Sequence, residues 1–119
     1  MQYLLLIYGT EGHFQKLPGT AREKMEQEYG EFTQSIAKSG HLRGANELDV
    51  TAKATTVRVR DGERLITDGP FAETKEQLGG YYLIEAAHLD DALNIAARIP
   101  SARYGSIEVR PIIPHEMPS

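Results

Sequence analysis

Two short runs of the chain are apolar at every position. The first, Tyr3-Leu4-Leu5-Leu6-Ile7-Tyr8, ends at Gly9, and the second, Tyr81-Tyr82-Leu83-Ile84, follows Gly79-Gly80. Each run is too short for most helices and has no polar residue at alternate positions, a pattern typical of strands covered on both faces. We therefore expect both runs to be central strands of a sheet with a layer of structure on each side.

Two amphipathic segments can supply one of these layers. Thr20-Ala21-Arg22-Glu23 matches the Ser/Thr-x-x-Glu capping box, so a helix should begin there and end at Gly40, a C-terminal cap. A second stripe of apolar residues runs from Leu89 to Ile99 and stops at Pro100. The first helix carries its own apolar stripe at three- and four-residue steps: Ala21, Met25, Tyr29, Phe32 and Ile36.

A hairpin is predicted by the dipeptide Asp61-Gly62, because both central positions of a type I′ turn need a positive φ. Its strands are Thr55–Arg60 and Glu63–Thr67. This register sets Val57 opposite Ile66, and the alternation of strand residues puts Asp68 at the end of the same apolar face.

The rest of the chain has weaker patterns. His41–Lys53 predicts at most a short irregular strand near Leu48, since Gly44, Asn46 and Asp49 interrupt it. Residues 107–111 alternate apolar and charged side chains, which predicts a last strand nearer an edge, followed by a short tail over 112–119.

The order of these elements over residues 1–119 predicts one domain of the α+β class. Strand, helix, hairpin, strand, helix, strand suits a sandwich in which two helices cover one face of a mostly antiparallel sheet. The other face would then expose an apolar patch larger than the ~300 to 600 Å² usual for a monomer. A loop folded over that face would cover it, but we expect a homodimer that packs sheet against sheet.

Composition excludes several classes of function. Thirteen Lys and Arg against seventeen Asp and Glu leave a formal charge of −4, which argues against a nucleic-acid partner. No stretch is long and apolar enough to predict a membrane span, and Met1 is followed by no basic signal-peptide start, so we expect a cytoplasmic protein. The absence of Cys excludes disulfides, thiolate chemistry and Cys-based metal sites.

Familiar catalytic motifs are also absent from the sequence. No nucleotide-binding glycine motif and no Gly-x-Ser-x-Gly elbow occur. The histidines have no metal-binding spacing, so we expect neither a metal nor a cofactor; they are His13, His41, His88 and His115.

The segment Asp68–Glu76 is the candidate site. Gly69-Pro70 bends the chain directly after a strand, beside acids, a lysine and an aromatic ring that could shelter them. Alternatively, Asp68 bonds the backbone of its own turn, and Glu73 and Lys75 are solvated charges. In the functional interpretation, Asp68 is the acid or base, Lys75 or Arg58 holds an anionic group, Tyr29 or Tyr82 offers a hydroxyl, and Phe71 excludes water.

At this segment the sequence resembles the DGPF branch of the YCII-related proteins. Asp68–Glu76, continued by Gln77–Ile84, looks like the signature of that branch, and the likeness covers nearly the whole chain. Supporting matches are Thr56-Val57-Arg58, Asp61-Gly62, Ala92-Leu93, Ala96–Pro100 and Glu108–Pro111.

The resemblance implies a ferredoxin-like domain that pairs through its sheets into a dimeric α/β barrel. Some relatives in the wider superfamily resemble muconolactone isomerases and dehalogenases, in which a His–Asp pair in the cleft handles protons. The first-helix His of that pair has no match between Thr20 and Tyr29, where the chain carries Glu23, Glu26 and Glu28. Members of the branch are often encoded beside extracytoplasmic-function sigma factors, which implies a regulatory or accessory role.

Three functions follow as hypotheses. The first is a dimer that binds a small organic molecule near the Asp68 turn, with acid–base chemistry such as isomerisation or elimination. The second is a non-catalytic regulatory module that binds a sigma factor or another protein through its exposed helices. The third, a purely structural dimer, requires backbone donors to satisfy Asp68 fully.

Overall fold

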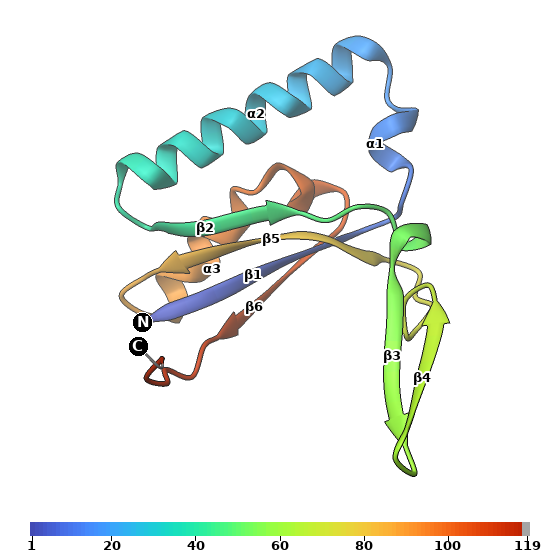
Figure 1. The fold of residues 1–119 in the computed structure, drawn as a ribbon. Coiled ribbons are helices and arrows are strands. Elements are labelled where there is room, and N and C mark those ends of the chain that lie inside the picture. Colours follow the sequence, from blue (N-terminus) through green and yellow to red (C-terminus); the bar gives the residue numbers. More distant parts are fainter. Residues whose placement is uncertain (118–119) are drawn as a thin grey trace.

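The computed structural model describes residues 1–117, so the last two residues of the predicted tail lie outside it. Figure 1 shows the elements in chain order. They are β1 (Gln2–Gly9), α1 (His13–Lys16), α2 (Gly19–Lys38), β2 (Leu42–Glu47), η1 (Thr51–Lys53), β3 (Thr55–Arg60), β4 (Glu63–Asp68), β5 (Gln77–Glu85), α3 (Leu89–Ala97), η2 (Pro100–Arg103) and β6 (Ser106–Pro111).

The main sheet has four strands in the order β2-β5-β1-β6, and every neighbouring pair is antiparallel. The two fully apolar runs form its central strands, as predicted: Leu5 of β1 lies between Tyr82 of β5 and Val109 of β6. This arrangement confirms the α+β class with a ferredoxin-like topology, in which the β3–β4 hairpin is inserted between β2 and β5.

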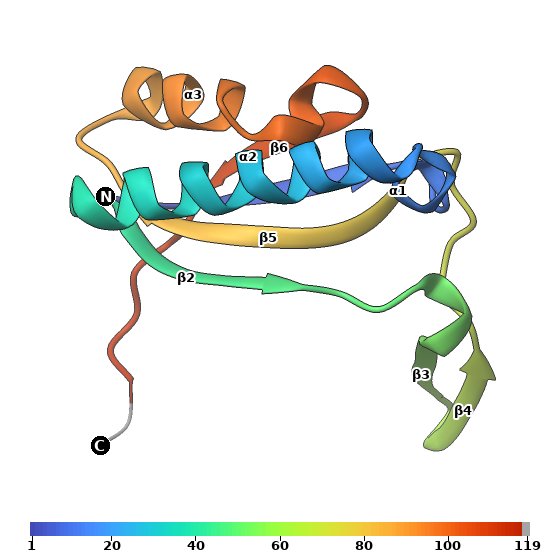
Figure 2. The ribbon, with the colours of Figure 1, turned by 90° about the horizontal axis from the view of Figure 1, so that it is seen from above.

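Helices α2 and α3 cover one face of the sheet (Figure 2). The apolar core lies between these layers, and its largest fully buried side chains are Leu5, Ile36, Ile84 and Ile99. Burial of each contributes about 1.5 to 3 kcal/mol relative to exposure to water. The helical stripe predicted from Met25, Phe32 and Ile36 is therefore the stripe that faces the sheet.

The two ends of α2 differ in how well they match the sequence prediction. The Thr20–Glu23 capping box is not formed, because the N-cap is Pro18, two residues before Thr20, with no side-chain hydrogen bond. The C-terminal end is as predicted: Gly40 has φ 85°, His41 N donates to Ile36 O, and Gly40 N donates to Ala37 O. This is the Schellman arrangement, which requires a left-handed residue and therefore favours glycine.

The predicted hairpin is also present. Asp61 and Gly62 both have positive φ, and Val57 pairs with Ile66 in the predicted register. The hairpin forms a separate two-stranded sheet that projects away from the main one (Figure 1). One of its faces carries Val57, Val59 and Ile66, each 59 % exposed, so this arm is an apolar surface without a covering layer within the described chain.

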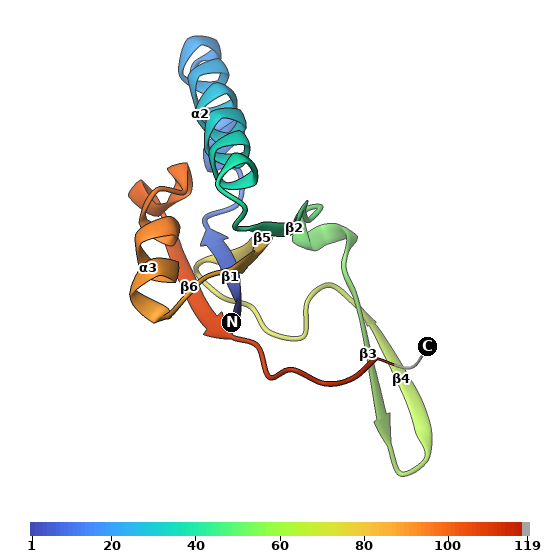
Figure 3. The same ribbon diagram turned by 90° about the vertical axis from the view of Figure 1, so that its left-hand side faces the viewer.

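The second face of the main sheet has no helix over it within residues 1–117. Leu4, Leu6 and Leu83 alternate with core residues along β1 and β5 and so point to this face. Figure 3 shows that the hairpin and the segment after β6 both extend on this side, away from α2 and α3. Among the described residues, no helix is both long and apolar enough to cross a membrane.

Candidate functional site

A cavity of about 610 Å³ lies at the end of the sheet where β1 runs into α1. Its walls come from the loop after β1, α1, the first half of α2, the ends of β2 and β5, and the segment from η2 to β6. This volume lies within the ~300 to 1,000 Å³ range of small-molecule sites. Met25, Gly80 and Tyr82 are buried at its inner end, whereas Glu26, Glu47 and Asp49 are exposed, so it leads from the interior to solvent.

Glycines shape this end of the sheet. Residues 80, 82 and 84 of β5 are the buried, helix-facing ones, and Gly80 carries no side chain there. A Cβ at Gly80 would lie 2.9 Å from the carbonyl oxygen of Asn46. A Cβ at Gly105 would overlap the carbonyl oxygen of Tyr8. The close backbone contacts at this end of the sheet, β5 with β2 and the segment before β6 with β1, therefore depend on glycine.

A pair of hydroxyl groups lies on the wall of the cavity. Tyr29 of α2 and Ser101 of η2 share a hydrogen bond through their side-chain oxygens. Burial raises the pKa of the Tyr29 phenol, and the neighbouring Tyr82 phenol and Glu47 carboxylate add to this rise, whereas the bond to Ser101 opposes it. Tyr29 is therefore a neutral hydroxyl at ordinary pH and can donate a hydrogen bond.

Tyr82 is a second phenol of the lining, but its hydroxyl has a protein partner. Its oxygen lies 2.7 Å from Thr33 Oγ1, and its ring packs edge-on against Phe32 with centroids 5.1 Å apart. Tyr82 thus joins the cavity to the apolar core. The contact holds β5 and α2 together at the inner end of the site.

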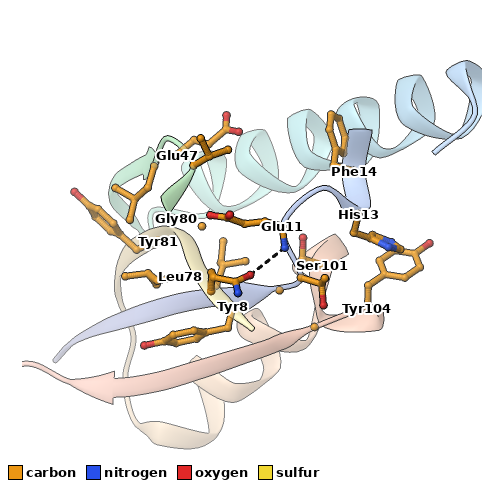
Figure 4. Close-up of a pocket in the computed structure, with 18 of the residues that line it drawn as sticks. Tyr8, Glu11, His13, Phe14, Glu47, Leu78, Gly80, Tyr81, Ser101 and Tyr104 are labelled. Carbon is orange, nitrogen blue, oxygen red and sulfur yellow. Dashed lines mark hydrogen bonds between the residues drawn. The ribbon is translucent and has the colours of Figure 1, made fainter. Parts of the chain in front are cut away.

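An imidazole also lines the cavity, beside Tyr104 (Figure 4). His13 is the first residue of α1, and its ring centroid is 4.9 Å from that of Tyr104. Gly12, with φ 85°, makes the left-handed turn that starts α1. Neither ring nitrogen of His13 is hydrogen-bonded within residues 1–117, so the imidazole is available to a bound molecule.

Glu11 links the cavity to the root of the hairpin. Its Oε1 accepts from Thr51 N at 2.6 Å, and its Oε2 accepts from Thr51 Oγ1 at 2.9 Å. Its own backbone N–H donates to Gln77 Oε1 at 3.0 Å, and Gln77 Nε2 donates to Thr74 O at 2.6 Å. Both ends of the hairpin insertion are thereby fastened to the loop that lines the cavity.

The structure separates the predicted site residues into two groups. Tyr29 and Tyr82 line the cavity, whereas Asp68, Arg58, Phe71 and Lys75 lie outside it, on or after the hairpin. Asp68 is exposed, and its carboxylate accepts no hydrogen bond within residues 1–117.

The backbone bend that follows Asp68 is held by hydrogen bonds of neighbouring residues. Gly69 N donates to Ala54 O, and Thr56 Oγ1 donates to Gly69 O. Phe71 is 77 % exposed and shelters no charge within the single chain. A role for Asp68 or its neighbours therefore stays a prediction, and the cavity is a separate candidate site.

Sequence reasoning missed Glu11, His13, Glu47, Ser101 and Tyr104 as parts of one site. They come from three segments that are far apart in the chain, residues 11–13, 47 and 101–104, so no local spacing connects all of them. A usable signal was present in the glycines. A helix-facing glycine in an otherwise bulky strand, here Gly80, marks a place where another backbone segment or a ligand approaches closely. Within the described residues, no group of three or more His, Cys, Asp or Glu is arranged to hold a metal ion.

The topology and the cavity together define a ferredoxin-like α+β protein with a ligand-sized space between its sheet and its long helix. A model of the YCII-related domain matches residues 1–116, so the chain belongs to the YCII-related domain family. An uncharacterized protein of Rhizobium meliloti (strain 1021) is 38 % identical over the full length of both chains.

A solved structure with a similar fold is 5-chloro-2-hydroxyhydroquinone dehydrochlorinase from Burkholderia phenoliruptrix AC1100, in complex with 2,5-dihydroxybenzoquinone. The likeness covers 95 % of this chain and 94 % of that one, with a TM-score of 0.55 and 12 % identity. At this identity the comparison shows a shared fold.

Proposed function

We propose that the chain binds a small ring-shaped organic molecule bearing hydroxyl or carbonyl groups in this cavity, and moves a proton on it. The observation that carries the proposal is a cavity of about 610 Å³ that brings a free imidazole and a neutral, half-buried phenol to the same space. The dehydrochlorinase of similar fold binds a molecule of this kind, which supports the choice of ligand class.

The proposed chemistry is general acid–base catalysis. His13 accepts a proton from a carbon next to a carbonyl group, since an imidazole can take up and return a proton near neutral pH. The Tyr29 hydroxyl donates a hydrogen bond to the carbonyl oxygen, which carries the electron pair left by the proton. Return of the proton to another position gives an isomerisation, and loss of a leaving group gives an elimination.

Binding is tested by thermal unfolding in the presence of resorcinol. We expect the melting temperature to rise, because a ligand at tenfold its Kd stabilises the folded state by about 1.4 kcal/mol. The rise should be smaller for Tyr29→Phe and unchanged for Tyr3→Phe, whose hydroxyl contacts Met1 outside the cavity. No rise with resorcinol or with any other monocyclic phenol of a panel would contradict the proposal.

Proton transfer is tested with 4-hydroxyphenylacetone in D₂O. The protein should accelerate incorporation of deuterium next to the ketone, measured by mass spectrometry, and His13→Gln should return the rate to that of buffer. His88→Gln is the matched control, since His88 precedes α3 and lies outside the cavity. Exchange no faster with the protein than in buffer would remove the catalytic part of the proposal.

The assembly we propose is a homodimer through the uncovered face of the sheet. That face carries Leu4, Leu6 and Leu83. The hairpin, one face of which is apolar, projects on the same side of the sheet (Figure 3). An isolated two-stranded hairpin is only marginally stable in water, so a covering surface would stabilise it. Sedimentation at micromolar concentration should report a dimer. A monomer that co-purifies with a sigma factor encoded by an adjacent gene would favour the regulatory alternative.

A further inference from the structure

The charged side chains that line the cavity are of one sign. Four carboxylates contribute to its walls, whereas no lysine or arginine does so within the described residues. The acids are Glu11, Glu26, Glu47 and Asp49. An anionic molecule would enter this space without any fixed positive charge to hold it, apart from a protonated His13.

Two of these carboxylates are free to bind a ligand. Both oxygens of Glu11 accept from Thr51, and Asp49 Oδ1 accepts from Val50 N. In contrast, the carboxylates of Glu26 and Glu47 form no hydrogen bond or ion pair within residues 1–117. The charge of Glu47 also acts inside the cavity, since it contributes to the raised pKa of Tyr29.

The uncharged part of the lining is rich in aromatic rings. Six phenyl or phenol rings contribute to the cavity, from Tyr8, Phe14, Tyr29, Tyr81, Tyr82 and Tyr104. The face of such a ring attracts a cation through its quadrupole, and this attraction strengthens where water is displaced. Aromatic walls combined with free carboxylates favour a positively charged organic group over a neutral or negative one.

We infer that the cavity takes an organic cation, an amine attached to a ring of about six atoms, with its ammonium group near Glu26 and Glu47. This inference rests on the proposed function and narrows its ligand class. The ring of the ligand lies among the aromatic side chains, and its ring hydroxyl or carbonyl group faces Tyr29. The positive charge of the ligand is thereby compensated at the mouth of the cavity, where both carboxylates are exposed.

Three probes of nearly equal size but different charge test whether the charge of the ligand decides its affinity. Tyramine is a cation at pH 7, 4-hydroxyphenylacetamide is neutral and 4-hydroxyphenylacetate is an anion. Calorimetric titration at low ionic strength should give tyramine the tightest binding, by roughly tenfold or more over the anion. Added salt should reduce this preference, because the carboxylates at the mouth are exposed and their charges are screened.

The decisive variant is Glu47→Gln, with Glu63→Gln as its matched control. Both remove one negative charge, but Glu63 lies at the tip of the hairpin and outside the cavity. Tyramine should bind several-fold more weakly to Glu47→Gln and with unchanged affinity to Glu63→Gln. Binding of the neutral amide should be the same for all three proteins.

Each outcome decides the inference. Equal or tighter binding of the anion, or an equal loss of tyramine affinity in both variants, would overturn the organic-cation assignment while leaving a small-molecule site in place. Failure of all three probes to bind would also overturn it, and the resorcinol experiment would then decide the proposed function by itself.

Discussion

The hydrogen bond between Tyr29 and Ser101 allows a quantitative test of how much one contact in the cavity wall stabilises the folded protein. It joins α2 to η2, elements more than seventy residues apart in the chain. Tyr29→Phe keeps the ring and removes only the hydroxyl group. A typical intramolecular hydrogen bond contributes about 1 kcal/mol net, so the free energy of unfolding at pH 7 should fall by about that amount. For a chain of this size the melting temperature should fall by about 4 °C.

The pH dependence of this effect has a definite sign. The pKa of Tyr29 is raised in the folded protein, so folding favours the protonated phenol. This contribution is fully present below the ordinary tyrosine pKa of about 10 and is lost as the pH rises through the raised value. The wild-type chain should therefore lose stability above about pH 10 more steeply than Tyr29→Phe, whereas Tyr104→Phe should keep the wild-type slope.

Urea unfolding followed by circular dichroism, at one fixed protein concentration, measures these differences. A double-mutant cycle with Ser101→Ala should give a coupling free energy of about 1 kcal/mol. Additive effects of the two substitutions, or a stability difference between wild type and Tyr29→Phe that stays constant from pH 7 to 11, would refute the reasoning.

Three further predictions concern the walls and the outer surface. Gly80→Ala should lower the free energy of unfolding by about 1 to 3 kcal/mol in urea melts, because its Cβ would meet a backbone carbonyl of β2. Gly30→Ala is the control: it adds a Cβ in open space on α2 and should instead raise the free energy of unfolding by up to about 1 kcal/mol. Glu11→Gln should speed limited proteolysis at the hairpin root, because one charge-assisted acceptor is lost; an unchanged cleavage rate would show that Glu11 does not hold the hairpin. Ile66→Asp should shift sedimentation toward the monomer, while Leu65→Asp on the other hairpin face should not; equal effects would argue against that face as the contact.

Much of the fold could be predicted because local patterns and tertiary structure agree. The Asp61-Gly62 turn determined the register of the hairpin, and Gly40 marked the end of α2, since both positions need a positive φ. The doubly apolar runs became the two central strands; one face of these strands packs against the helices, while the other has no helix over it within residues 1–117.

Other elements depend on contacts that a sequence pattern does not record. β2 has little hydrophobic alternation and lies at the edge of the sheet, where backbone bonds to β5 form it. The capping box at Thr20 failed because the helix already begins at Gly19, after the N-cap Pro18. The cavity was missed because its lining residues are brought together only by the packing of α1, η2 and β5.

The most direct test of the candidate site is an amide NMR titration with resorcinol and tyramine, because the chain carries glycines both in the cavity and on the hairpin. If the cavity is the site, the signals of Gly9, Gly80 and Gly105 should shift and saturate together, while those of Gly62 and Gly69 stay in place. Shifts of Gly69 without shifts of the cavity glycines would place the ligand at the Asp68 turn instead and would contradict the account.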